Sequence, residues 1–404
     1  MRKSVIIFSA VIFLVASAVY LLLYRKNSDV ISLPKDADAV VVIDAKKLQR
    51  KYLSAFITNP SVWNAKKGEP NFLFDSSVKR RDYYFAVHLK NSPAGSWFLQ
   101  LDLKDEKAFR ENLLKNKFVE EQYYFRKDRL FIWFKSEKAF VGTSPDPFQY
   151  LAENKNFETK KAEDYLSNGD AGIWFFNGKE TFKSDIFFND ESITFGNQNS
   201  EDSEENLLNS IKRQTQFLTA SADEKTIKDF QSIFGTSVFG NNDILEIDAE
   251  ADLEEVNDTI ITYGYDENFD ETEKISFQKI VQPRYHIIFK SKNPTALFDY
   301  SKSQRWINDE MAFTKIPFQP NRVTVENDQF RIHSIPQLQR NKTIKDRNFI
   351  FIKNSKLLSQ LLKVLPANEK KLLEQTEYFF AVKRRNSFFA EIKFKPNTLP
   401  LILR

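Results

Sequence analysis

The chain of 404 residues contains no cysteine. This absence excludes disulfide bonds, thiolate nucleophiles and metal sites built on cysteine ligands. It also excludes a lipoprotein anchor, which requires a lipid-modified cysteine after the leader segment. A chain without thiols agrees with an exported protein, because such a protein needs no thiol chemistry.

Glycine and histidine are scarce as well. Only 10 of the 404 residues are glycine, whereas the usual share is about 7%. None of the glycine patterns that cradle phosphates or form a nucleophile elbow is present. The histidines, His88, His286 and His333, fall far apart in expected strands, and no paired-histidine zinc motif occurs. We therefore predict no catalytic residue, no metal site and no cofactor.

The start of the chain holds the one long apolar run. Residues 5–23 carry no charge, and two basic residues stand on each side of them. A helix of about 19 residues, rising about 1.5 Å per residue, is close to the roughly 30 Å hydrocarbon core of a bilayer. A signal peptide cleaved after the small residues 16–18 is the alternative. We predict an uncleaved signal anchor over residues 1–26, carried by Val5, Ile6, Ile7, Phe8, Leu14, Leu21, Leu22 and Leu23.

The flanking charges give a weak orientation for this anchor. The amino terminus with Arg2 and Lys3 slightly outweighs Arg25 and Lys26, which favours an N-terminus in the cytoplasm. We therefore predict a single-pass membrane protein whose body is extracytoplasmic, in the periplasm. A linker over residues 27–38 would keep that body close to the bilayer, so we expect a protein partner at the membrane surface and no nucleic acid.

The body of the chain has the composition of folded domains. Aromatic residues make up 14% of the chain, including 39 phenylalanines, which is too hydrophobic for a disordered stalk. Residues 39–168 show an order of strand, helix, two strands, helix and strand. This order predicts an α+β domain in which helices pack on one face of a mainly antiparallel sheet.

The end of the chain repeats the beginning. Residues 378–387 align with residues 83–92 at six identical positions of ten, and residues 388–395 then align with 97–104. A strand followed by a leucine-rich helix precedes both segments. We therefore predict a second α+β domain over residues 169–404 that contains a C-terminal repeat of the first unit.

The opening of the first unit suggests a resemblance. Residues 33–40 read LPKDADAV, a proline and an acidic residue before alanine, followed by a strand and a helix. This opening resembles uncharacterised bacterial envelope proteins built from repeated strand–helix–hairpin units and tethered by an N-terminal helix or a lipid. The resemblance covers most of residues 33–404 in outline and implies location and architecture only.

One segment is strongly acidic. Residues 243–273 contain thirteen acidic residues and no basic one. Glu246, Asp248, Glu250 and Asp252 would share one face of a strand, where they could bind calcium weakly. Residues 266–277 begin like a calcium loop, but they lack its glycine and its final glutamate. We interpret the segment as a solvated acidic surface.

Three aromatic residues are candidates for a partner or ligand contact. Trp63, Phe72 and Phe74 lie in a part of the first unit that the C-terminal repeat lacks. The leading hypothesis is a non-enzymatic, membrane-tethered envelope scaffold or protein-interaction module. A periplasmic protein that binds a hydrophobic ligand, lipid or unfolded chain is the alternative. A hydrolase with dispersed carboxylates is the third, because the acids of such a pair come from distant segments. The sequence predicts no oligomeric state.

Overall fold

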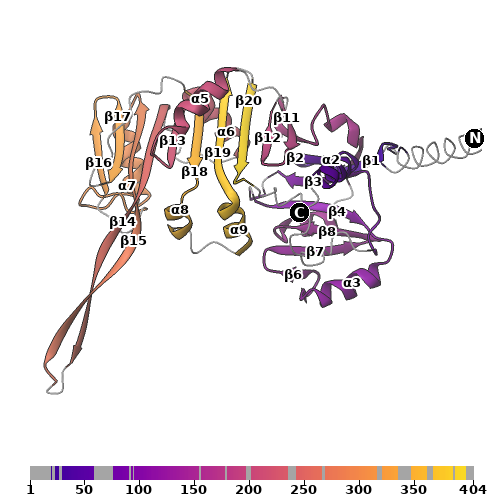
Figure 1. Ribbon diagram of the computed structural model, residues 1–404, viewed down its shortest axis with the longest axis horizontal. Coiled ribbons are helices and arrows are strands. Elements are labelled where there is room, and N and C mark those ends of the chain that lie inside the picture. The colour runs from indigo at the N-terminus through magenta and orange to yellow at the C-terminus, as the bar shows by residue number, and fades with distance from the viewer. Residues whose placement is uncertain are drawn as a thin grey trace, which may run out of the picture. The chain divides into compact units, whose positions relative to one another are not determined.

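The computed structural model describes most of the chain after residue 30. The described residues fall into two compact units divided between Phe188 and Asn189 (Figure 1). The predicted domain boundary between residues 168 and 169 stays a prediction. The described residues are 20, 23–26, 30–58, 76–90, 92–93, 95–153, 156–177, 180–196, 202–234, 243–265, 269–315, 321–334, 347–361, 367–384 and 387–396.

Unit 1 is built on one antiparallel sheet. Its strand order is β11-β10-β2-β3-β4-β8-β7-β6-β5, and β1 (Val30–Pro34) pairs separately with β9 (Phe157–Lys161). The strands are β2 (Ala37–Asp44), β3 (Tyr83–Leu89), β4 (Trp97–Asp102), β5 (Val119–Glu120), β6 (Phe125–Lys127), β7 (Leu130–Lys135), β8 (Lys138–Gly142), β10 (Ala171–Asn177) and β11 (Glu180–Phe188). The helices are α2 (Ala45–Thr58), α3 (Glu106–Lys115), α4 (Asp146–Glu153) and η3 (Ala162–Tyr165).

Unit 2 also contains a run of antiparallel sheet. Its order is β12-β20-β19-β18-β13-β14-β15-β17-β16. The strands are β12 (Ser192–Phe195), β13 (Leu218–Asp223), β14 (Ile244–Tyr265), β15 (Glu271–Ser291), β16 (Asn321–Glu326), β17 (Gln329–Ser334), β18 (Phe349–Lys353), β19 (Thr376–Arg384) and β20 (Ser387–Phe394). The helices are α5 (Asp202–Lys212), α6 (Glu224–Phe234), α7 (Pro294–Ser303), α8 (Lys356–Leu361) and α9 (Ala367–Gln375).

The predicted α+β class with a transmembrane helix is wrong. Strands hold far more of the described residues than helices do, so the fold is mainly β with extensive antiparallel pairing. The largest difference from the prediction is in the acidic segment, which was interpreted as a solvated surface. Most of it belongs to the 22-residue strand β14, which pairs with the 21-residue strand β15.

The predicted membrane anchor is also overturned. Within the described part of the chain, no helix is long and apolar enough to cross a membrane. The longest described helix, α2, has 14 residues and spans about 21 Å, short of a roughly 30 Å hydrocarbon core. The single-pass topology and the periplasmic assignment are corrected with it. Leu23 is helical, and the other anchor residues lie outside the described residues: Val5, Ile6, Ile7, Phe8, Leu14, Leu21 and Leu22.

The two segments that align by sequence also pair in the same register. In unit 1, Phe85 of β3 pairs with Val42 of β2, and the next residue, Ala86, pairs with Leu99 of β4. In unit 2, the aligned residues of β18, β19 and β20 form the same pairs. Because a slip of one residue would turn every side chain to the opposite face, this agreement is a strong sign of a repeated unit.

A third, central copy of the plan lies between these two. Its elements follow the order β13, α6, β14, β15, α7, β16, β17. Unit 1 has the same order in β2, α2, β3, β4, α3, β7, β8, apart from the short strands β5 and β6 before β7. The last strand pairs with the second hairpin strand in both, β17 with β15 and β8 with β4. The helix caps repeat as well. Asp44 and Asp223 each accept a hydrogen bond from the backbone N–H three residues later, and Asp105 and Asn293 do the same at the second helix.

The central copy differs in the length of its hairpin. The residues between β3 and β4 are only 90–96, whereas β14 and β15 pair continuously from Glu246 to Tyr265. The neighbouring strand β13 pairs with β14 only as far as Ala251, and β17 pairs with β15 only from His286 onward. We call residues 252–265 and 271–284 the arm. Figure 1 shows the arm leaving the sheet of unit 2 as a two-stranded ribbon.

Candidate functional site

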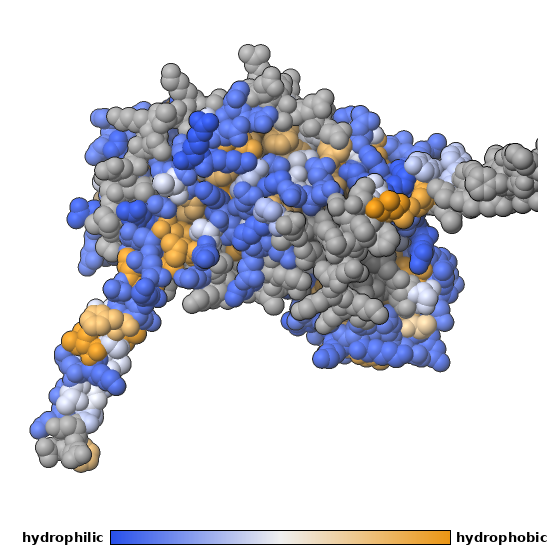
Figure 2. Space-filling model, in the orientation of Figure 1, coloured by the Kyte–Doolittle hydropathy of each residue, from blue (hydrophilic) through white to orange (hydrophobic). Residues whose placement is uncertain are grey.

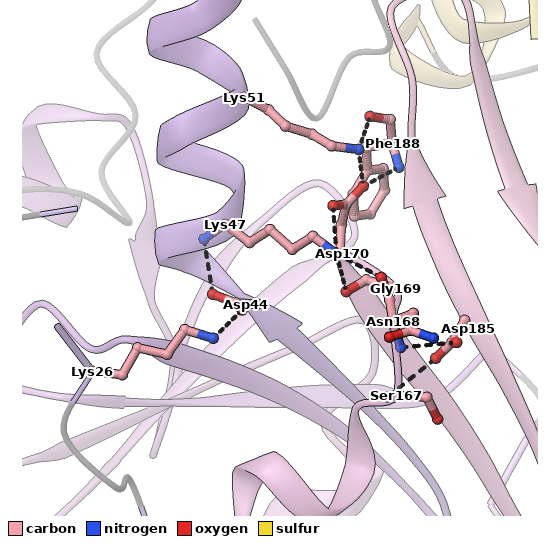
Figure 3. Close-up of polar contacts among 10 residues, drawn as sticks. All are labelled: Lys26, Asp44, Lys47, Lys51, Ser167, Asn168, Gly169, Asp170, Asp185 and Phe188. Atoms are coloured by element: carbon pink, nitrogen blue, oxygen red, sulfur yellow. Dashed lines mark hydrogen bonds and ion pairs between the residues drawn. The ribbon is translucent and has the colours of Figure 1, made fainter. Parts of the chain in front are cut away.

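The most deeply buried charges of unit 1 surround Asp170, which immediately precedes β10. Its side chain is fully buried, and its Oδ2 accepts a hydrogen bond of 2.8 Å from the backbone N–H of Phe188 (Figure 3). The ammonium group of Lys51 binds the same oxygen, and the Nζ of Lys47 lies 3.6 Å from Oδ1. Both lysines lie on α2, one turn apart. They therefore connect α2 to the open end of the β10–β11 hairpin, where Asp170 and Phe188 meet.

The neighbouring carboxylate of Asp44 completes this cluster. Its Oδ1 accepts the backbone N–H of Lys47 at 2.8 Å, and its Oδ2 binds the ammonium group of Lys26. The backbone N–H of Asp44 donates to the carbonyl of Asp170 at 2.9 Å. Each carboxylate is therefore engaged by cations and N–H donors that fix α2 to the sheet. This arrangement stabilises the fold and leaves neither carboxylate exposed for acid–base chemistry.

All three histidines lie in strands: His88 in β3, His286 in β15 and His333 in β17. His88 is buried rather than on a strand surface: its Nδ1 lies 2.6 Å from Asp38 Oδ1, and its Nε2 lies 2.9 Å from the carbonyl of Pro93. His286 and His333, distant in sequence, are cross-strand neighbours on β15 and β17. Among the described residues, no group of three or more histidine or acidic side chains is arranged to hold a metal ion.

The alternating acids of β14 have partners of their own. Glu246 binds Lys290 at 2.9 Å and Arg347 at 2.6 Å. Burial raises the pKa of Glu246, but the hydrogen bonds and charges of these two cations outweigh it and hold the pKa below its ordinary value. Asp248 accepts the hydroxyl of Ser221 at 2.8 Å. The first part of the incomplete calcium loop, residues 266–268, lies outside the described residues.

The three predicted aromatic contacts, Trp63, Phe72 and Phe74, also lie outside the described residues. A different set of exposed apolar side chains is on the arm. Residues that pair across an antiparallel ribbon share a face, so the odd-numbered residues of the arm form one face. We call it the apolar face, and its large hydrophobic members are Ile261, Tyr263, Tyr265, Ile275 and Phe277.

These side chains are highly exposed. Tyr265 and Phe277 are each 73% exposed, and the central pair, Ile261 and Ile275, is 47% and 56% exposed. Figure 2 shows hydrophobic residues along the arm, beyond the sheet from which it leaves. Single exposed apolar residues are ordinary on protein surfaces, but a continuous row from two paired strands is typical of an interaction site.

The opposite face of the arm is more polar and internally bonded. Gln278 donates to Asp258 at 3.2 Å, and Gln282 donates to Glu254 at 3.0 Å. The apolar residues on this face, Val256, Ile260 and Ile280, are only partly exposed. The ribbon is therefore amphipathic, and its more apolar side is also its more exposed side.

Leu253 at the base of the arm is buried, but no described strand pairs with either side of the arm. A two-stranded hairpin alone is only marginally stable in water, and three strands or a packed layer are usually needed. Sequence reasoning missed the arm because it weighed the acidic residues of 243–273 and not their alternation with isoleucine and tyrosine. That alternation, visible in TIITYGY at residues 259–265, was the available signal.

Comparison of the chain with protein-family models, curated proteins and solved structures finds no match.

Proposed function

We propose that this protein is a non-enzymatic protein-interaction module in which the repeated sheets form a scaffold and the arm is the binding element. The observation that carries this proposal is the exposed apolar face of the arm. Three buried carboxylates, those of Asp44, Asp170 and Glu246, also support it. Each forms an ion pair with a lysine of the same unit, which gives it a structural role.

The apolar face is large enough to drive binding. Full burial of a large apolar side chain contributes about 1.5–3 kcal/mol, and partial burial correspondingly less. If each of the five side chains gained about 1.5 kcal/mol, the gross gain of roughly 7.5 kcal/mol would exceed the lower end, about 4 kcal/mol, of the cost of association. We therefore expect weak to moderate affinity, in which loss of one central side chain is measurable.

Site-specific photo-crosslinking tests the proposal. A photoreactive phenylalanine analogue replaces Phe277 on the apolar face in the full chain, expressed at its natural level in its own cells. A second variant carries the same group at Gln278, which points to the opposite face and is the matched control. We expect far more protein adducts from position 277 than from position 278, because only the side chain at position 277 lies on the apolar face.

The opposite result is equally clear. Equal yields from the two positions would mean that the apolar face is not a binding surface. An absence of protein adducts at position 277 would contradict the proposal as well.

A further inference from the structure

We propose that the apolar face of the arm binds the same face of a second copy of this chain. The two arms would lie antiparallel, face to face, about a two-fold axis that passes between the Ile261–Ile275 pairs of the two copies. This inference rests on the proposed function, because it names the partner of the arm.

The positions along the arm are self-complementary about this centre. A two-fold axis at the pair Ile261–Ile275 places each pair opposite the pair equally far on the other side. The pair Asn257–Lys279 then faces the pair Tyr265–Glu271 of the second copy. The ammonium group of Lys279, which lies 2.6 Å from Glu255 of its own arm, would then also stand opposite the carboxylate of Glu271 of the second copy at both ends of the interface.

The same operation covers the aromatic side chains. The pair Thr259–Phe277 faces the pair Tyr263–Glu273 of the second copy, so that large side chains of one arm lie against small or flexible ones of the other. The isoleucine pairs meet at the centre. The centre of the interface is therefore isoleucine, tyrosine and phenylalanine, and the carboxylate of Glu273 lies at the open edge of the ribbon, where it stays in water.

The antiparallel arrangement also keeps the rest of the two molecules apart. The overlap from residue 257 to residue 265 is nine positions, or about 30 Å at a strand rise of about 3.4 Å. Each arm begins at residue 252, so the two sheets from which the arms leave would lie at opposite ends of the overlap. A parallel arrangement would bring both sheets to the same end.

The size of the contact predicts a reversible dimer. A ribbon face about 30 Å long and two strands wide buries on the order of 1,000 Å² in total when paired, near the lower limit for a specific interface. We expect a dissociation constant in the micromolar range.

The salt dependence of binding distinguishes a second copy of this chain from a basic protein as the partner. Residues 252–284 contain nine acidic and three basic residues, so two arms repel each other at long range. Salt screens that repulsion and leaves apolar contact intact, so self-association should strengthen as salt is added. Binding of the acidic arm to a basic protein would weaken instead.

The absence of cysteine allows a direct test in the full-length chain. In the variant Ile261→Cys, the introduced residue is the only thiol, and the two-fold axis places both copies of it across a gap of about 10 Å, the spacing of packed sheets. A bismaleimide of matching span should join two chains. The control Thr262→Cys has its thiol on the opposite face and should give at least ten times less covalent dimer. Equal yields, or no dimer from Ile261→Cys at about 100 µM protein, would overturn the proposal.

Sedimentation velocity gives an independent readout. We expect Ile275→Glu to raise the dissociation constant at least tenfold and Ser276→Glu, on the opposite face, to change it less than threefold. Raising the salt from about 0.05 M to about 0.5 M should increase the dimer fraction. A wild-type chain that stays monomeric, an equal loss in both variants, or dissociation by salt would each contradict the inference. Adducts of another protein at position 277, with no dimer from Ile261→Cys, would remove this inference and leave the proposed function standing.

Discussion

The buried carboxylate of Asp170 makes the sharpest prediction for the stability of unit 1. Substitution Asp170→Asn keeps the shape of the side chain and an oxygen that can accept the N–H of Phe188. It removes the negative charge that holds Lys47 and Lys51, and those two ammonium groups then face a neutral amide.

The structure sets the expected size of this effect. Breaking a buried ion pair by removing one partner costs about 3–5 kcal/mol. The side chains of Lys47 and Lys51 are 30% and 37% exposed, so both can turn toward water and recover part of that loss. We therefore expect a cost of about 2–3 kcal/mol, which lowers the melting temperature of a unit of this size by roughly 5–10 °C.

Calorimetry combined with hydrogen exchange measures this prediction. We expect the transition of unit 1 to move, and amide exchange to accelerate in α2, β10 and β11, while unit 2 is unaffected. Glu158→Gln, which removes an exposed pair with Lys160 in the same unit, is the control and should not change the melting temperature measurably. A normal melting temperature for Asp170→Asn would refute the assignment of Asp170 as the residue that fixes α2 to the sheet.

Three further predictions concern pH, backbone space and the arm. The pKa of Glu246 lies below its ordinary value of 4.5 in the folded chain, so its carboxylate stabilises unit 2 above pH 4.5. This stabilisation is lost as the pH falls through the pKa that Glu246 has in the folded chain. Denaturant unfolding over a pH series should therefore show a weaker loss of stability in acid for Glu246→Gln than for the wild type. Gly172→Ala should destabilise unit 1 in thermal unfolding, because its Cβ would lie 2.1 Å from the carbonyl oxygen of Tyr165, whereas Gly95→Ala meets nothing within 4 Å and should be neutral. Replacing residues 256–280 by a two-residue Asn-Gly turn, which joins the paired residues Glu255 and Val281, should leave the melting temperature of unit 2 within about 2 °C of the wild type, because the removed segment is mostly exposed; a larger loss would show that the arm is part of the core.

The sequence was informative where local patterns decide the structure. Alternation over residues 83–89 and 97–103 predicts a hairpin, and residues 83–89 and 97–102 form β3 and β4. Helix α3 follows from an acidic cap at Asp105 and the inward spacing of Phe109 and Leu113. These features depend on neighbouring residues, so a reader of the sequence has all the information that is needed.

The candidate sites were beyond such reasoning. Asp170 and Lys51 are 119 residues apart, and no spacing rule connects them. The alternation at Ile261, Tyr263 and Tyr265 predicts a strand with one apolar face, but alternation ordinarily indicates that the apolar face is buried. Only the pairing of the strands shows that no third strand covers the arm in the described chain. Exposure is a property of the assembled sheet, and for that reason the arm was missed.

The central claim is that the apolar face of the arm is a binding surface, and the yield of protein adducts at residues 277 and 278 tests it most directly. The two residues are adjacent on β15 and equally far along the arm, so they differ chiefly in the face that they occupy. We expect far more adducts from position 277 than from position 278. Equal yields from the two positions would contradict this claim.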